Sequence, residues 1–129
     1  MNNVIKNVLE RKQDILNKTM EYENLNTENI QYDHAKECMK LYDFFDKNFS
    51  DDEIMVIQSI MYFGRECFSD GKPECDGSIE ETIERWMRYL FFSFGNKINK
   101  EIEIDQMVEK GLKIGTYFKL AFEYFEKSK

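Results

Sequence analysis

The sequence predicts an all-α fold, a single compact bundle of about five helices in which residues 1–129 form one domain. Three observations favour this class. One proline and six glycines in 129 residues leave few positions that interrupt a helix. Apolar residues recur three or four positions apart through most of the chain, which is the spacing of one helical face. Ser50 with Glu53, and Ser78 with Glu81, have the spacing of helix-start capping boxes.

The first two helices are expected at residues 3–22 and 33–49. Asp33 precedes the second helix and is predicted to cap it. Residues 23–31 are polar and rich in asparagine, and they are predicted to form a linker. The apolar positions are Ile5, Val8, Leu9, Ile15, Leu16 and Met20 in the first helix, and Ala35, Cys38, Met39, Tyr42, Phe45 and Phe49 in the second.

The third and fourth helices are expected to begin at the two capping boxes and to run to about residues 68 and 94. Gly71, Pro73 and Gly77 predict a loop at residues 69–77 between them. Gly95 stands where a glycine typically ends a helix. The predicted apolar stripes are Ile54, Ile57, Ile60, Met61, Gly64 and Phe68 in the third helix, and Ile79, Ile83, Trp86, Met87, Leu90, Phe91 and Phe94 in the fourth.

Residues 96–103 alternate weakly and are expected to form a loop or one short strand. The last helix is predicted over residues 104–127, where the apolar spacing is cleanest. Gly111 and Gly115 lie four apart on its apolar face, although glycine inside a helix costs about 1 kcal/mol relative to alanine. Their spacing predicts a groove in which another helix or a large ring approaches the backbone.

The charge balance restricts the partners of this chain. It has 18 lysines and arginines against 25 acidic residues, a formal net charge of -7. Direct nucleic-acid binding is not expected, because it needs an excess of cations to displace counterions from phosphate. The acidic balance also disfavours attachment to anionic lipid. No apolar run is long enough to cross a membrane.

Compartment and cofactors are inferred from what the sequence lacks. No basic region followed by an apolar run appears near the start, so no secretory signal is expected. The three cysteines are then expected to be reduced thiols in a cytoplasmic protein. The chain carries no glycine-rich phosphate loop, dinucleotide fingerprint or nucleophile elbow. We therefore expect no enzymatic activity and no cofactor.

A zinc-supported domain is one alternative. His34 and Cys38 are four residues apart, so a helix would present both on one face. Cys67 and Cys75 bracket the glycine- and proline-containing loop. Together these four residues form a Cys₃His set of the kind that tetrahedral zinc accepts.

Aromatic residues favour a protein-interaction module, the leading hypothesis. The chain has 11 phenylalanines, 7 tyrosines and 1 tryptophan, and contiguous aromatics cannot all face one core. We expect Phe44, Phe45, Tyr89, Phe91 and Phe92 to contribute to an exposed patch, because aromatics are enriched at interfaces. The patch would serve self-association or a protein partner. A further alternative is an acidic inhibitor of phage type that mimics nucleic acid, with its carboxylates at Asp51, Asp52, Glu53, Glu80, Glu81 and Glu84.

One stretch resembles a known family. The run Met61-Tyr62-Phe63-Gly64-Arg65 is similar to the central signature of a small uncharacterised bacterial family, domain of unknown function 3775. Glu109-Lys110-Gly111-Leu112 is similar to a later stretch of that family. The chain departs from the family by having Glu66 in place of a glycine, and the resemblance implies no activity. Independently, Gly64 would allow close helix approach, and Arg65 would pair with a carboxylate of the fold or of a ligand.

Overall fold

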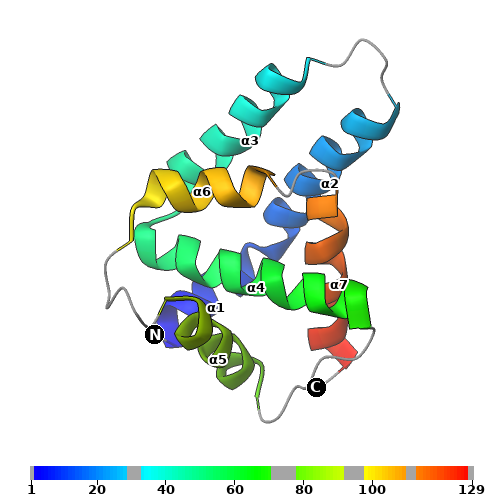
Figure 1. Ribbon diagram of the computed structural model, residues 1–129. Coiled ribbons are helices and arrows are strands. Elements are labelled where there is room, and N and C mark those ends of the chain that lie inside the picture. The colour runs from blue at the N-terminus through cyan, green and yellow to red at the C-terminus, as the bar shows by residue number, and fades with distance from the viewer. Residues whose placement is uncertain (1, 29–32, 71–77, 92–97, 110–112, 128–129) are drawn as a thin grey trace.

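The computed structural model describes residues 2–28, 33–70, 78–91, 98–109 and 113–127, and every regular element within these ranges is a helix (Figure 1). The helices are α1 (Asn2–Glu10), α2 (Lys12–Glu28), α3 (His34–Asn48), α4 (Asp51–Asp70), α5 (Ile79–Phe91), α6 (Lys100–Glu109) and α7 (Ile114–Lys127). The all-α class is confirmed. The expected number of helices is wrong, because the first and last predicted helices are each divided in two.

Helix α4 lies at the centre of the molecule. It contacts α1, α5, α6 and α7, while α7 also packs on α2, and α3 lies outside against α2 and α6 (Figure 1). Residues 54–61 of α4 are all buried, so this helix is covered on every side. A helix that is apolar all round is typical of such a position. Two of those residues, Gln58 and Ser59, are nevertheless polar.

The first predicted helix divides at Arg11. The Arg11 guanidinium donates to the Asn48 carbonyl oxygen at 2.8 Å and lies 4.5 Å from the centre of the Phe49 ring. These contacts tie the break to the end of α3. On the two sides of the break the helices have different neighbours. Helix α1 packs on α4 and α5, whereas α2 packs on α7 and α3. Helix α2 then continues through Glu28, so the linker predicted at residues 23–31 is wrong for residues 23–28.

The last predicted helix also divides, since α6 ends at Glu109 and α7 begins at Ile114. The Glu23 carboxylate of α2 caps α7 from outside. It accepts from the Thr116 backbone amide at 3.0 Å and from the Thr116 hydroxyl at 2.7 Å. The first amides of a helix have no partner within it, so the carboxylate supplies one.

Two glycines allow helices to cross closely. A Cβ atom at Gly64 would overlap the backbone carbonyl of Tyr117, so α4 meets the backbone of α7 there. A Cβ atom at Gly115 would lie 2.9 Å from both the Met20 Cα atom and the Thr19 carbonyl oxygen of α2. The close approach predicted at Gly115 is confirmed. Gly111 lies outside the described residues.

The predicted helix starts are largely confirmed. Asp33 accepts from the Lys36 amide at 3.2 Å. Ser50 and Glu53 form both bonds of a capping box, at 2.9 and 3.2 Å, and the Glu81 amide donates to the Ser78 hydroxyl at 3.1 Å.

One start was missed. Asn99 accepts from the Ile102 amide at 3.2 Å and caps α6, so the expectation of a loop or strand at residues 96–103 is wrong from Lys100 onward. The loop predicted at residues 69–77 is wrong for residues 69–70, which belong to α4, while residues 71–77 and the helix end predicted at Gly95 lie outside the described ranges. In the part of the chain that is described, no helix has the length and apolar character needed to cross a bilayer.

Candidate interaction surface

The structure brings together one pair of the four suggested metal ligands. On the first turns of α3, His34 Nε2 and Cys38 Sγ are 3.4 Å apart, and the Tyr22 hydroxyl of α2 lies 3.2 Å from the same sulfur. Cys67 is buried near the end of α4, and Cys75 lies outside the described residues. Figure 1 shows the start of α3 well separated from the end of α4. Among the described residues, no three histidine, cysteine or acidic side chains converge as a metal site.

The suggested aromatic set does not form one surface. Phe45 and Phe91 are core residues with 0% and 5% of their surface exposed, so neither is accessible to a partner. Phe44 is half-buried, with its ring edge on Phe45 and Phe49. Phe92 lies outside the described residues. Among the described members of this set, only Tyr89 is exposed, at 74%.

Tyr89 lies at the end of a row of rings that begins in the core. Phe63 stacks on Phe125 with ring centres 5.1 Å apart, and Trp86 meets Phe63 edge-on at 6.5 Å. Tyr89 then meets Trp86 edge-on at 5.8 Å. Edge-to-face contacts of this kind stabilise ring pairs beyond their buried area. The row therefore supports an exposed tyrosine on the outer side of α5.

A second exposed aromatic lies where α4 ends beside α7. Phe68 is 50% exposed, although its position in the apolar stripe had predicted burial. Its ring meets the half-buried Tyr117 of α7 edge-on at 5.8 Å, and the Lys113 ammonium lies 5.7 Å from its centre. Arg65 precedes Phe68 by three residues and Tyr62 precedes Arg65 by three, so each successive pair is adjacent on the surface of α4. We call Tyr62, Arg65, Phe68, Lys113 and Tyr117 the basic aromatic patch.

The two cations of the basic aromatic patch are not neutralised by the described part of the fold. Arg65 and Lys113 are both exposed, and neither forms an ion pair with a described carboxylate. Arg65 is three residues from Phe68 on α4, and the Lys113 ammonium lies 5.7 Å from the centre of its ring. Arginine and aromatic side chains together are the composition typical of binding hot spots.

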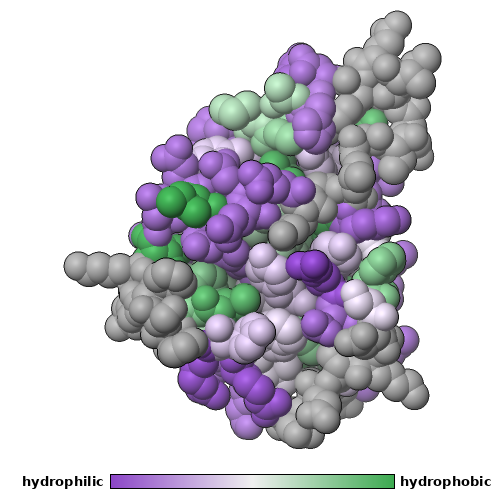
Figure 2. All heavy atoms as spheres, in the orientation of Figure 1, coloured by the Kyte–Doolittle hydropathy of each residue, from purple (hydrophilic) through white to green (hydrophobic). Residues whose placement is uncertain are grey.

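Helices α3 and α6 carry a surface of the opposite sign. Asp43 and Asp46 lie on one side of α3 with Met39, which is 58% exposed, and Glu101 and Asp105 lie on α6 with Ile102, which is 51% exposed. Lys100 pairs with Asp46 at 3.6 Å, whereas the other three carboxylates form no ion pair within the described residues. The acidic patch is defined as Met39, Tyr42, Asp43, Asp46, Glu101, Ile102 and Asp105. Figure 2 shows hydrophobic side chains among hydrophilic ones over α3 and α6 and again where α4 ends beside α7.

The charges of the acidic patch affect the pKa of the Tyr42 hydroxyl. Burial against the fold raises the pKa of the Tyr42 hydroxyl above its ordinary value, because the phenolate loses solvent. The negative charges of Glu101, Asp46, Asp105 and Asp43 raise this pKa further, in that order. The four carboxylates, which come from α3 and α6, therefore all raise the pKa of the same hydroxyl.

One of the acids expected to form a nucleic-acid-like face, Glu53, has a structural role instead. The Glu53 carboxylate accepts from the Ser50 amide and caps α4, while Asp51 and Asp52 are exposed in the same first turn. Carboxylates at a helix N-terminus are stabilised by the helix dipole. The acidic patch on α3 and α6 was missed, because no sequence pattern links residues some sixty positions apart.

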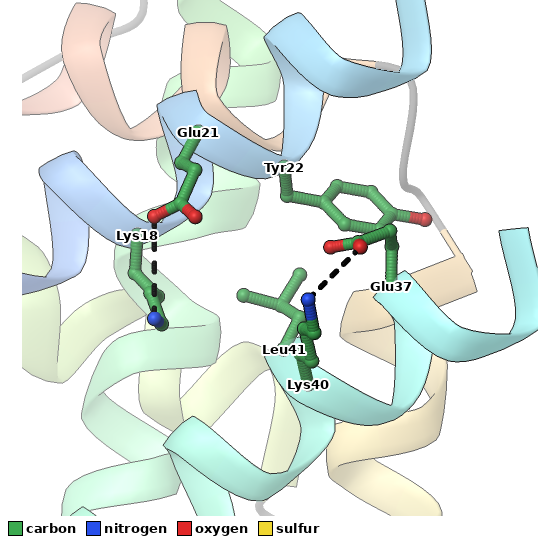
Figure 3. Close-up of a pocket in the computed structure, with 6 residues that line it drawn as sticks. All are labelled: Lys18, Glu21, Tyr22, Glu37, Lys40 and Leu41. Atoms are coloured by element: carbon green, nitrogen blue, oxygen red, sulfur yellow. Dashed lines mark hydrogen bonds and ion pairs between the residues drawn. The ribbon is translucent and has the colours of Figure 1, made fainter. Parts of the chain in front are cut away.

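Three hollows are lined by described residues. The pocket between α2 and α3 in Figure 3 has a volume of about 20 Å³, roughly one water molecule, with Leu41 and the Tyr22 ring beside it. Two ion pairs line it, Lys40 with Glu37 at 3.2 Å and Lys18 with Glu21 at 4.0 Å. Two larger grooves, of about 260 and 380 Å³, lie on either side of the ion pair that joins Lys12 to Glu126 at 2.9 Å.

The described residues form an all-α protein with exposed aromatic side chains, and some charged side chains of its surface patches form no ion pair within the described part of the chain. No protein-family model, curated protein or solved structure matches this chain.

Proposed function

We propose that this protein is a non-enzymatic interaction module that binds a protein partner through the basic aromatic patch. The carrying observation is the placement of Phe68, half-exposed between the Tyr117 ring and the Lys113 ammonium. Its position is held by the fold, so little side-chain freedom remains to be lost on binding.

The supporting structure of the patch favours a preorganised surface. Gly64 precedes Arg65 and lies against the backbone of Tyr117, so the α4–α7 crossing fixes the spacing between the two halves of the patch. Sites on packed helices hold their side chains more precisely than sites on loops. Tyr89 on α5 is a further exposed aromatic, but it does not belong to the basic aromatic patch. A partner that binds Tyr89 would therefore use a separate surface of the protein.

Photo-crosslinking tests the proposed function. Phe68 is replaced by p-benzoylphenylalanine in cells that express the protein natively, and exposed Asn17 on α2 receives the same replacement as a matched control. We expect position 68 to crosslink to protein well above the level at position 17. Adding Arg65→Glu is expected to reduce the yield at least several-fold. Equal yields at the two positions would contradict the proposed surface.

A second candidate function is zinc binding at His34 and Cys38, favoured by their geometry. Tetrahedral zinc with a Zn–S distance of about 2.3 Å and a Zn–N distance of about 2.0 Å places the two ligand atoms about 3.5 Å apart. The observed separation is 3.4 Å. These two side chains would hold the ion at the start of α3, with its remaining positions available to other donors.

Cobalt substitutes for zinc as a spectroscopic probe of this second candidate. Titration of the purified chain with Co²⁺ is expected to give a thiolate-to-metal charge-transfer band that is lost in Cys38→Ser and weakened in His34→Ala. A band that persists in Cys38→Ser would assign the metal elsewhere. The absence of any band would remove this candidate.

A further inference from the structure

We infer that the partner of the basic aromatic patch is a second copy of this chain, which presents its acidic patch. This inference rests on the proposed function and names the partner of the same surface. Each patch combines exposed apolar side chains with charged ones, and the charges of the two patches are of opposite sign. Both halves of a complementary contact are therefore carried by one chain.

The charges argue for this pairing. The acidic patch keeps three carboxylates, Asp43, Glu101 and Asp105, without an ion pair among the described residues. The basic aromatic patch has two cations, Arg65 and Lys113, that likewise form no ion pair within the described residues. Opposing patches of complementary potential steer two proteins together and fix their register. A contact between copies would supply these groups with partners that they lack among the described residues of their own chain.

The apolar centres argue for contact rather than long-range attraction alone. Met39 and Ile102 are two of four large hydrophobic side chains found exposed in the described ranges, and Phe68 is a third. Methionine adapts its shape and makes favourable contacts with aromatic rings. Burying the exposed parts of these side chains against one another removes apolar surface from water.

The placement of the two patches restricts the type of assembly. They lie on different helices, α3 with α6 and α4 with α7, so each contact joins unlike surfaces of two copies. Two such contacts related by a two-fold axis make a closed dimer. One contact per pair of copies instead leaves an acidic and a basic aromatic patch unoccupied at the ends, and that assembly closes into a ring or grows with concentration.

Charge reversal on each patch tests the inference, with mass measured by light scattering after size-exclusion chromatography. Arg65→Glu with Lys113→Glu reverses the basic aromatic patch, and Asp43→Lys with Asp105→Lys reverses the acidic patch. Lys6→Glu with Lys119→Glu is the matched control, because both lysines are exposed and belong to neither patch. Circular dichroism checks that each variant is folded.

We expect the wild type and the control to associate, each reversed variant to elute as a monomer, and an equimolar mixture of the two reversed variants to associate again. A mixture that stays monomeric would overturn the pairing of the two patches. A reversed variant that associates as the wild type does would overturn it too.

The crosslinking at position 68 distinguishes failure of the proposed function from failure of the proposed self-association. Crosslinks to a second copy of the chain support both. Crosslinks to a different protein, together with unchanged masses in the reversed variants, would overturn the self-association and leave the proposed function standing. Crosslinking at background level would overturn both.

Discussion

Gly64 of α4 lies directly against the backbone carbonyl of Tyr117 in α7, with no room between them for a Cβ atom. This contact sets the distance between the two helices that carry the basic aromatic patch. Arg65 and Phe68 belong to α4, and Lys113 immediately precedes α7. The crossing therefore couples a packing requirement to the geometry of the proposed surface.

Gly64→Ala tests the crossing. Alanine stabilises a helix interior by about 1 kcal/mol relative to glycine, so helix propensity alone predicts a gain. Here the added methyl group meets backbone, which cannot rotate away, and overpacking of this kind costs about 1–3 kcal/mol. We expect a net loss in the free energy of unfolding, measured by urea denaturation. Ser69→Ala, at an exposed position of the same helix, should change it by less than about 0.5 kcal/mol. A Gly64→Ala variant more stable than the wild type would show that α4 and α7 are further apart.

The cap supplied by Glu23 is predicted to stabilise the start of α7. Glu23→Ala removes both bonds to Thr116 and should lower the free energy of unfolding by about 0.5–2 kcal/mol, the range found for lost helix caps. Thr116→Val removes only the hydroxyl bond and should cost less. In a double-mutant cycle the two losses should be non-additive by at least about 0.5 kcal/mol. Additive losses would mean that the two side chains do not interact.

Gln58 is predicted to be replaceable by an apolar residue. Its side-chain oxygen is buried in the centre of α4 without a hydrogen-bond partner. A buried acceptor without a partner costs about 1–3 kcal/mol. Gln58→Met keeps a similar length without that cost, so thermal denaturation should show equal or higher stability. A loss of more than about 1 kcal/mol would indicate that the oxygen has a partner in solution.

Tyr42 is predicted to report the acidic patch through its titration. Desolvation, and then the charges of Glu101 and its neighbours, raise the pKa of this hydroxyl above about 10. The phenolate is thus less favourable in the folded than in the unfolded state. The contribution of Tyr42 to stability is present below pH 10 and is lost as the pH rises through the folded-state pKa. Subtracting the ultraviolet titration of Tyr42→Phe from that of the wild type isolates this group.

Glu101→Gln supplies the control for that titration. Removing the largest of the four charge effects should lower the pKa of Tyr42, and added salt should also lower it by screening the remaining carboxylates. A Tyr42 pKa that responds to neither change would place the carboxylates further from the ring. The acidic patch would then lack the charge density on which the proposed contact depends.

Local features of the fold were predictable from the sequence because they depend on neighbouring residues. The capping box at Ser50 and the cap at Asp33 are made within four residues of chain, so their spacing alone indicates them. The divisions at Arg11 and between α6 and α7 were not predictable in this way. Contacts from distant elements accompany both, from Asn48 to Arg11 and from Glu23 to Thr116. Helical periodicity carries no information about such contacts.

The candidate surfaces were less predictable than the fold. Aromatic content correctly indicated that some rings would be exposed, but periodicity could not tell the buried Phe45 from the exposed Tyr89. Phe68 belongs to a regular apolar stripe, yet it lies two residues before the end of α4 and is half-exposed. Each patch is assembled from two helices far apart in the sequence, so its charges become neighbours only in the folded chain.

Native mass spectrometry of the purified, untagged chain at increasing concentration tests the central claim most directly. We expect multiples of the 15.6 kDa chain without bound metal, growing with concentration and declining as the ammonium acetate concentration is raised. A single 15.6 kDa species at every concentration would contradict self-association through the two patches.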